Sequence, residues 1–326
     1  MSGMTDEGRM ATAPPRIESL TTPRRGRLSI RTREAIDCYV FMLPAILGLL
    51  LFWLGPMVAS FGLSFTEYNM LSSPKWIGLQ NYSDLARDEL FWKSLRVTAI
   101  YSVVSVPLVL GTALLLAVLL NQKFPGVLFF RSVYYLPTVM SGVAVATLWR
   151  WIFNQDFGFI NLLLDKFFGI YGPGWLIQER WALTSLILTS LWTAGGSMLI
   201  FLAGLQGIPA DLYEAAELDG AGRWNRFRSI TFPLLSHVTF FNLVLGIIGA
   251  LQVFTEAFVL TRGGPNNATL LLSLYLYRNA FEYLKMGYAS AIAWVMFLIV
   301  MVMTLIVFRS APAWVHYEQE REKGAA

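Results

Sequence analysis

Residues 205–235 read LQGIPADLYEAAELDGAGRWNRFRSITFPLL, and this polar segment lies between two long apolar runs. Its charged residues are Asp211, Glu214, Glu217 and Asp219, followed by Arg223, Arg226 and Arg228. A connection that only rejoined two helices would need a handful of residues. We therefore expect residues 205–235, called the charged hairpin below, to fold into two short helices and to contact something beyond the neighbouring apolar runs.

The local signals within the charged hairpin are those of a helix, a corner and a second helix. Pro209 suits the first turn of a helix, where its missing N–H is not needed. Asp211 and Glu214 follow early, where carboxylates interact favourably with the positive end of the helix. Gly220 can take the left-handed backbone angles that end a helix. A second short helix is predicted over residues 222–230.

The composition is that of an integral membrane protein. The 326 residues have a mean hydropathy of +0.54. Only 14% of them are charged, against roughly 25% in ordinary soluble domains. The charges are clustered, which leaves apolar stretches of about 20 residues, long enough to cross a bilayer as helices. The chain is predicted to be an all-α membrane protein with six transmembrane helices and the charged hairpin between the fourth and the fifth.

The predicted organisation has three parts. Residues 1–34 are expected to be a flexible cytoplasmic tail, residues 35–310 the membrane domain, and residues 311–326 a second cytoplasmic tail. The six spans are predicted at about residues 39–61, 97–120, 132–153, 182–203, 238–260 and 288–308. Lys and Arg are more numerous in the segments that this arrangement places inside, which puts both termini in the cytoplasm. Most of that excess lies in residues 1–38.

The sequence lacks several common catalytic and phosphate-binding motifs, and it has few cysteines and histidines. It contains no phosphate-binding G-x-x-x-x-G-K-[ST] loop, no G-x-S-x-G and no H-E-x-x-H. Cys38 is the only cysteine, and His237 and His316 lack partners at metal-ligand spacing. No catalytic residue and no metal site is therefore predicted. The basic tail is explained by membrane topology, so nucleic acid is not an expected partner.

The charged hairpin also carries a specific motif. Glu214-Ala215-Ala216-x-x-Asp219-Gly220-Ala221, followed by Ile230-Thr231-Phe232-Pro233, resembles the EAA loop of the membrane subunits of bacterial ABC importers. Phe232 and His237 stand where that family more often has Leu and Pro. The resemblance implies that the hairpin forms coupling helices that dock on an ATP-binding subunit. The coupling residues that it implies are Glu214, Ala215, Ala216, Asp219, Gly220, Arg223 and Pro233.

Two further stretches resemble the carbohydrate importers of that family. They are residues 254–269, FTEAFVLTRGGPNNAT, and residues 77–82, IGLQNY. The resemblance implies a permease half of an ATP-driven sugar importer in the bacterial inner membrane, for a disaccharide or oligosaccharide. It further implies a second permease subunit, a dimeric ATPase that binds ATP and Mg, and an extracytoplasmic substrate-binding protein. The chain itself would then be a transport subunit in contact with lipid, without a cofactor or an ATPase site.

Polar residues within the predicted spans are candidates for the substrate path. They are Glu256, Gln252, Asn242 and Tyr135, and each could instead make an interhelical contact. Two other functions stay open. One is an ABC permease for a related polar solute such as glycerol-3-phosphate. The other is a secondary carrier, although the spans hold few of the buried charges that ion-coupled carriers use.

Overall fold

The computed structural model describes residues 30–122 and 124–315, and these form two compact units that divide between Met57 and Val58. Most of the two predicted tails lies outside the described residues. The first unit is helical and contains α1 (Ile30–Leu49), the π-helical turn η1 (Leu50–Leu54) and the start of α2 (Gly55–Leu63). In η1 the N–H of Gly55 bonds to the carbonyl of Leu50. This wide turn lies just before Pro56, whose ring cannot donate the next helical hydrogen bond.

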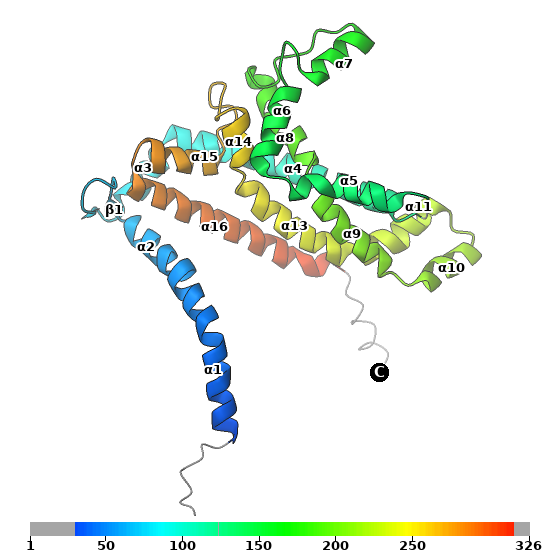
Figure 1. Ribbon diagram of the computed structural model, residues 1–326, viewed down its shortest axis with the longest axis horizontal. Coiled ribbons are helices and arrows are strands. Elements are labelled where there is room, and N and C mark those ends of the chain that lie inside the picture. Colours follow the sequence, from blue (N-terminus) through cyan, green and yellow to red (C-terminus); the bar gives the residue numbers. More distant parts are fainter. Residues whose placement is uncertain (1–29, 123, 316–326) are drawn as a thin grey trace, which may run out of the picture. The chain divides into compact units, whose positions relative to one another are not determined.

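The second unit contains nearly all of the remaining structure, and Figure 1 shows the order of its elements. After α2 these are β1 (Thr66–Glu67), β2 (Lys75–Trp76), α3 (Gln80–Arg87), α4 (Glu89–Leu120), α5 (Val127–Val139), α6 (Gly142–Ile152), α7 (Phe159–Phe168), α8 (Glu179–Leu191), α9 (Gly195–Gln206), α10 (Ala210–Leu218), α11 (Arg223–Arg226), η2 (Phe227–Thr231), α12 (Phe232–Leu234), α13 (Ser236–Leu251), α14 (Thr255–Leu260), α15 (Leu272–Tyr277), η3 (Arg278–Glu282), α16 (Met286–Ser310) and η4 (Ala311–Ala313). The two strands pair antiparallel.

Helix α4 lies at the centre of the second unit and packs against α8, α9, α13 and α15. Ala113 and Ala117 on α4 are fully buried, in a cluster with Met198 and Phe201 of α9. Small residues let helix backbones approach closely, which is the usual packing in membranes, where lipid removes the hydrophobic drive between helices. The interior of this unit is therefore built as a helix bundle around one long helix.

The membrane-protein prediction is confirmed, with differences in the individual spans. Within the described residues, four helices are long and apolar enough to cross a bilayer: Glu34–Leu63, Glu89–Leu120, Ser236–Leu260 and Met286–Ala313. The described part of the chain has up to six spans if each of two bent helix pairs counts as one. The span predicted from residue 97 belongs to a helix that starts at Glu89, because Asp88 caps it by accepting from the backbone N–H groups of Leu90 and Phe91.

The predicted third and fourth spans are not single straight helices. Helices α5 and α6 meet at an angle of 102°, and α8 and α9 at 43°. At the first break Met140 and Ser141 are extended, which interrupts the helical hydrogen-bond ladder between Val139 and Gly142. Hydropathy reports only the apolar character of such a stretch and carries no signal of the bend.

The two polar ends of the second unit lie opposite each other. Figure 1 shows β1, α3 and α15 at one end and α10 and α11 of the charged hairpin at the other. Helix α16 begins beside β1 and α3, and it packs along α13. These two ends, and the helix breaks between them, hold the candidate functional residues.

Candidate functional sites

The first helix of the charged hairpin is α10, and it ends in a glycine corner as predicted. Pro209 is the residue before the helix rather than its first residue, and Gly220 has φ +77°. The N–H of Gly220 bonds to the carbonyl of Glu217, and the N–H of Ala221 bonds to that of Ala216 at 2.8 Å. This pair of bonds is a Schellman motif, which requires a left-handed residue at the position of Gly220.

Two side-chain contacts hold α10 against the second part of the hairpin. The hydroxyls of Tyr213 and Thr231 are hydrogen-bonded at 2.9 Å. Arg226 donates to Glu217 at 3.0 Å in a largely exposed ion pair, a type that contributes roughly 0–1 kcal/mol to stability. The second predicted helix exists as α11 continued by the wider turn η2. The corner and these contacts make the hairpin a preformed unit.

The charged hairpin leaves large apolar side chains exposed beside its charges. Leu218 is 90% exposed and Trp224 is 70% exposed. Among the predicted coupling residues, Ala216 and Pro233 are half-buried and the other five are exposed. These exposed apolar side chains and the charges beside them are groups that a protein partner could cover.

The helix breaks lie side by side in the second unit. Gly195, at the start of α9, is so close to α5 that a Cβ on it would lie 2.0 Å from the carbonyl oxygen of Tyr134. A Cβ on Gly142, at the start of α6, would lie 3.5 Å from a methyl group of Thr255 in α14. Helix α14 also packs against α8. The breaks α5–α6, α8–α9 and α13–α14 therefore form one region, called the helix-break region below.

Broken helices free backbone groups, which in a bilayer must find other partners or line a water-filled cavity. At the α13–α14 break, the carbonyl of Val253 accepts a hydrogen bond from the hydroxyl of Ser273. Trp149 of α6 packs edge-on against Trp192 at the α8–α9 break, with ring centroids 5.6 Å apart. One freed carbonyl thus has a side-chain partner, and an aromatic contact packs α6 against the α8–α9 break.

Three of the four substrate-path candidates lie at the helix-break region. Gln252 is the exposed residue that follows α13, and Glu256 is half-buried in the first turn of α14. Tyr135 is exposed on α5, and its Cα lies 3.0 Å from the Cβ position of Gly195. Asn242 differs, because it is only 2% exposed and bonds to the carbonyl of Val238 within α13.

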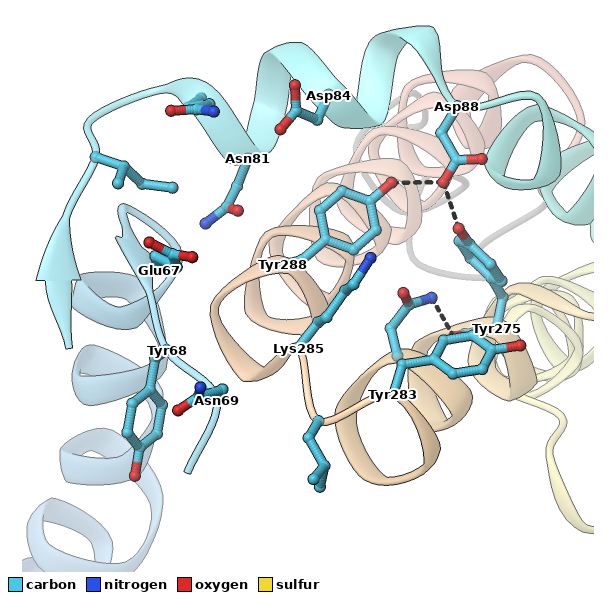
Figure 2. Close-up of a pocket in the computed structure, with 14 residues that line it drawn as sticks. Glu67, Tyr68, Asn69, Asn81, Asp84, Asp88, Tyr275, Tyr283, Lys285 and Tyr288 are labelled. Atoms are coloured by element: carbon cyan, nitrogen blue, oxygen red, sulfur yellow. Dashed lines mark hydrogen bonds between the residues drawn. The ribbon is translucent and has the colours of Figure 1, made fainter. Parts of the chain in front are cut away.

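A polar pocket lies at the end of the second unit opposite the charged hairpin, and Figure 2 shows its lining residues. We call it the Asp88 pocket; its volume is about 520 Å³. Its lining residues are Glu67, Tyr68, Asn69, Ile77, Gln80, Asn81, Asp84, Asp88, Tyr275, Asn279, Tyr283, Leu284, Lys285 and Tyr288. No sequence prediction named this pocket, although the IGLQNY stretch contributes three of its residues.

Asp88 organises one wall of the pocket. Its carboxylate accepts hydrogen bonds from the hydroxyls of Tyr275 and Tyr288, the latter at 2.6 Å. Burial raises the pKa of the Asp88 carboxyl, but the bonds from the two tyrosines and from two backbone N–H groups outweigh it. The pKa of Asp88 therefore lies below its ordinary value of 3.8. Burial and the bond to Asp88 raise the pKa of Tyr275 to about 12, so its hydroxyl remains a donor at neutral pH.

Replacing Asp88 with alanine is expected to destabilise this end of the protein. The change removes the N-cap of α4, typically worth ~1 kcal/mol, and leaves two tyrosine hydroxyls without their acceptor. Because the pKa of folded Asp88 is lowered, its stabilisation is complete above pH ~4 and is lost as the pH falls through the folded value. Thermal unfolding of purified protein against pH measures both effects. Asp84→Ala, in the same pocket, is the control, and an equal loss from both variants would contradict this role of Asp88.

The packing of β1 beside the pocket depends on Gly287 and Asn81. A Cβ on Gly287 would lie 2.0 Å from the carbonyl oxygen of Thr66, so only glycine allows α16 to start this close to β1. The Asn81 amide donates to the carbonyls of Ser64 and Thr66, both at 2.9 Å. Residues that resemble the carbohydrate importers in sequence thus have a structural role here.

A mainly helical membrane chain with adjoining helix breaks, a preformed polar hairpin and no phosphate-binding loop motif has the architecture of a transport permease subunit. The chain belongs to the family of binding-protein-dependent transport system inner membrane components, whose profile matches residues 109–314. It is therefore an inner membrane component of an ABC transporter, and its family role is that of a transport subunit.

Similar proteins support the same family. The probable ABC transporter permease protein YesP of Bacillus subtilis is 50% identical and covers 90% of this chain and 96% of its own. The lactose transport system permease protein LacF of Rhizobium radiobacter is 36% identical, covering 87% and 97%. A crystal structure of a bacterial ABC transporter involved in import of the acidic polysaccharide alginate has a chain that matches with a TM-score of 0.76 and 25% identity, covering 87% of this chain and 97% of that one.

Proposed function

We propose that this chain is the permease half of an ATP-driven importer of a sugar, either a disaccharide or an oligosaccharide. The observation that carries the proposal is the charged hairpin, a preformed and exposed structure at one end of the bundle in a chain whose sequence contains no G-x-x-x-x-G-K-[ST] loop. The names of relatives favour a sugar as the substrate, since they include lactose and trehalose/maltose transport permeases.

In this proposal the charged hairpin docks on a dimeric ATPase subunit that binds ATP and Mg. Glu214 and Asp219 supply exposed carboxylates, and Leu218 supplies exposed apolar surface for the contact. The hairpin is held together by the Gly220 corner and the Tyr213–Thr231 bond. It can therefore transmit a displacement as one body, and ATP binding by the partner shifts the permease between two states.

The substrate path passes along the helix-break region, which a second permease subunit completes. Glu256 and Gln252 offer hydrogen-bonding groups for hydroxyls, and Tyr135 offers an aromatic face for a sugar ring. Both termini face the cytoplasm with the hairpin, because the excess of Lys and Arg lies on that side. The substrate-binding protein then delivers sugar at the end that holds the Asp88 pocket.

Glu256→Gln is expected to lower sugar uptake by the complete transporter by about tenfold, since a hydrogen bond to a charged group contributes roughly 1.5–3 kcal/mol and one between neutral groups only roughly 0.5–1.5 kcal/mol. The substitution keeps the shape of the side chain and removes only its charge. Uptake of radiolabelled sugar by proteoliposomes measures the effect. Asp165→Asn, an exposed carboxylate on α7, is the matched control. Unchanged affinity and rate in the Glu256 variant would remove this residue from the path.

The proposed function is tested by purifying the tagged chain in mild detergent and identifying the co-purifying subunits by mass spectrometry. We expect a second permease, an ATPase and, after crosslinking, a binding protein. Reconstituted with ATP inside the vesicles, the complex should import lactose, trehalose or maltotriose. Uptake driven by an ion gradient with no ATPase subunit would overturn the proposal, and uptake of glycerol-3-phosphate alone would overturn the sugar assignment.

A further inference from the structure

The Asp88 pocket has walls that are fixed before any ligand arrives. The ring of Tyr288 is held by its hydroxyl bond to Asp88, and Asn81 is held by two backbone carbonyls. Figure 2 shows Tyr288 and Lys285 between the Asp88 side and the Glu67 side of the pocket. The volume of about 520 Å³ falls within the roughly 300–1,000 Å³ of small-molecule sites. A pocket with fixed walls loses little conformational freedom on binding.

The polar side chains of this pocket fall into two groups. Those of Asp88, Asn81 and Asn69 are hydrogen-bonded within the protein, whereas others have no partner in the described part of the chain. Glu67, Gln80, Asp84 and Lys285 are exposed and make no side-chain hydrogen bond or ion pair with the described residues. They offer two carboxylates, an amide and an ammonium group, which together can both accept and donate hydrogen bonds.

The combination of these groups with aromatic rings fits a sugar. Hydroxyls of a sugar donate to carboxylates and accept from an ammonium group or an amide, and the apolar face of the ring packs on an aromatic side chain. Tyr288 and Tyr283 both line the pocket, and the ring of Tyr288 is fixed by Asp88. The lining is therefore chemically varied enough to hold a polyhydroxylated ligand in one orientation.

The charge of the pocket limits which sugars it can accept. Three carboxylates, Glu67, Asp84 and Asp88, face a single ammonium group, that of Lys285. This excess of negative charge repels uronates and sugar phosphates and leaves neutral sugars unaffected. A pocket that accepts an acidic polysaccharide would instead need an excess of positive charge.

We propose that the Asp88 pocket is a second saccharide site, separate from the helix-break region, which binds a neutral sugar unit and rejects acidic ones. This inference rests on the proposed function, because that function places the pocket where the binding protein releases its sugar. The site would hold one unit of the substrate as it leaves the binding protein and before it enters the path. The charge of the pocket thereby predicts that the substrate is neutral, a property that the charged hairpin does not indicate.

Saturation-transfer NMR on the complete complex in nanodiscs tests the pocket directly. The neutral probes are lactose, trehalose and maltotriose, and the acidic probe is trigalacturonate. We expect transfer to at least one neutral probe and not to trigalacturonate. Gln80→Trp, which places a bulky side chain in the pocket, should weaken binding of the neutral probe about tenfold. Glu67→Gln combined with Asp84→Asn should raise binding of trigalacturonate several-fold.

Two comparisons distinguish sugar binding in the pocket from sugar binding in the path and from docking of the binding protein. Glu256→Gln should lower uptake but leave the pocket signal unchanged, whereas a signal lost in that variant would assign the sugar to the path.

Transfer to none of the probes, or equal transfer to neutral and acidic probes, would overturn the inference. The inference would also be overturned if the pocket variants changed only the affinity for the binding protein, because the pocket would then be a docking surface for a basic side chain of that protein. A complex that shows the pocket signal but imports no sugar would refute the proposed function alone.

Discussion

Gly220→Val is expected to abolish sugar uptake and the ATPase activity that accompanies it. Gly220 has φ +77°, and a β-branched residue is a strong outlier at positive φ. Valine would therefore break the Schellman corner that bonds Gly220 to Glu217 and Ala221 to Ala216. Strain of this kind costs roughly 1–3 kcal/mol, and here it falls on the surface that we propose contacts the ATPase. Uptake and ATP hydrolysis in proteoliposomes measure the loss.

Matched variants of the same loop distinguish loss of the Gly220 corner from a nonspecific effect of mutating the loop. Gly222→Ala is the control, because Gly222 has φ −65° and open space around its Cβ position. Gly220→Asn should retain part of the activity, since asparagine tolerates left-handed angles better than valine. Glu214→Lys should also abolish coupling by reversing a charge, with normal membrane insertion. Full uptake in Gly220→Val and Glu214→Lys would contradict the coupling role of the charged hairpin.

Gly195→Ala is expected to be the most damaging single-methyl change in the helix-break region. The new Cβ would lie 2.0 Å from the carbonyl oxygen of Tyr134, and neither backbone can move without shifting α5 or α9. Inserting a methyl group into a tightly packed contact costs roughly 1–3 kcal/mol. We expect a lower Tm of the purified protein and uptake reduced by at least about tenfold, because the break positions the residues of the proposed path.

Gly249→Ala is the control for that change. It also adds one methyl group to a glycine of a predicted span, but its Cβ position has no atom within 4 Å. Its Tm should stay the same or rise slightly, since alanine favours helix more than glycine does by roughly 1 kcal/mol. Equal Tm values for the two variants would show that the contact between Gly195 and Tyr134 is looser than the structure indicates.

The charged hairpin was predictable from sequence because its structure is set by neighbouring residues. The end of α10 depends on Gly220 and on backbone bonds that reach only a few positions back. The prediction of a second short helix was also correct in place, with α11 and η2 covering most of residues 222–230. The coupling role of Glu214 and Asp219 remains a prediction, because it concerns a surface that only a partner can test.

The helix breaks and the Asp88 pocket were not predicted, because both depend on residues far apart in the chain. The packing of α5 on α9 places Tyr134 against Gly195, and the close start of α16 places Gly287 against Thr66. The side chains that hold Asp88 come from positions 275 and 288. One local signal was present, since Asp88 followed by Glu89 and the apolar Leu90 and Phe91 has the form of a helix start. That signal would have moved the predicted start of the second span to Glu89.

The sequence by itself determined that this chain is a helical membrane protein with a structured polar hairpin. Hydropathy and capping act over a few turns of helix, so composition and spacing report them directly. Only the tertiary structure decided that the helix breaks adjoin and that Asp88 meets two distant tyrosines. These arrangements arise from packing between helices, where a glycine without a Cβ or one buried carboxylate fixes the approach of elements that are distant in sequence.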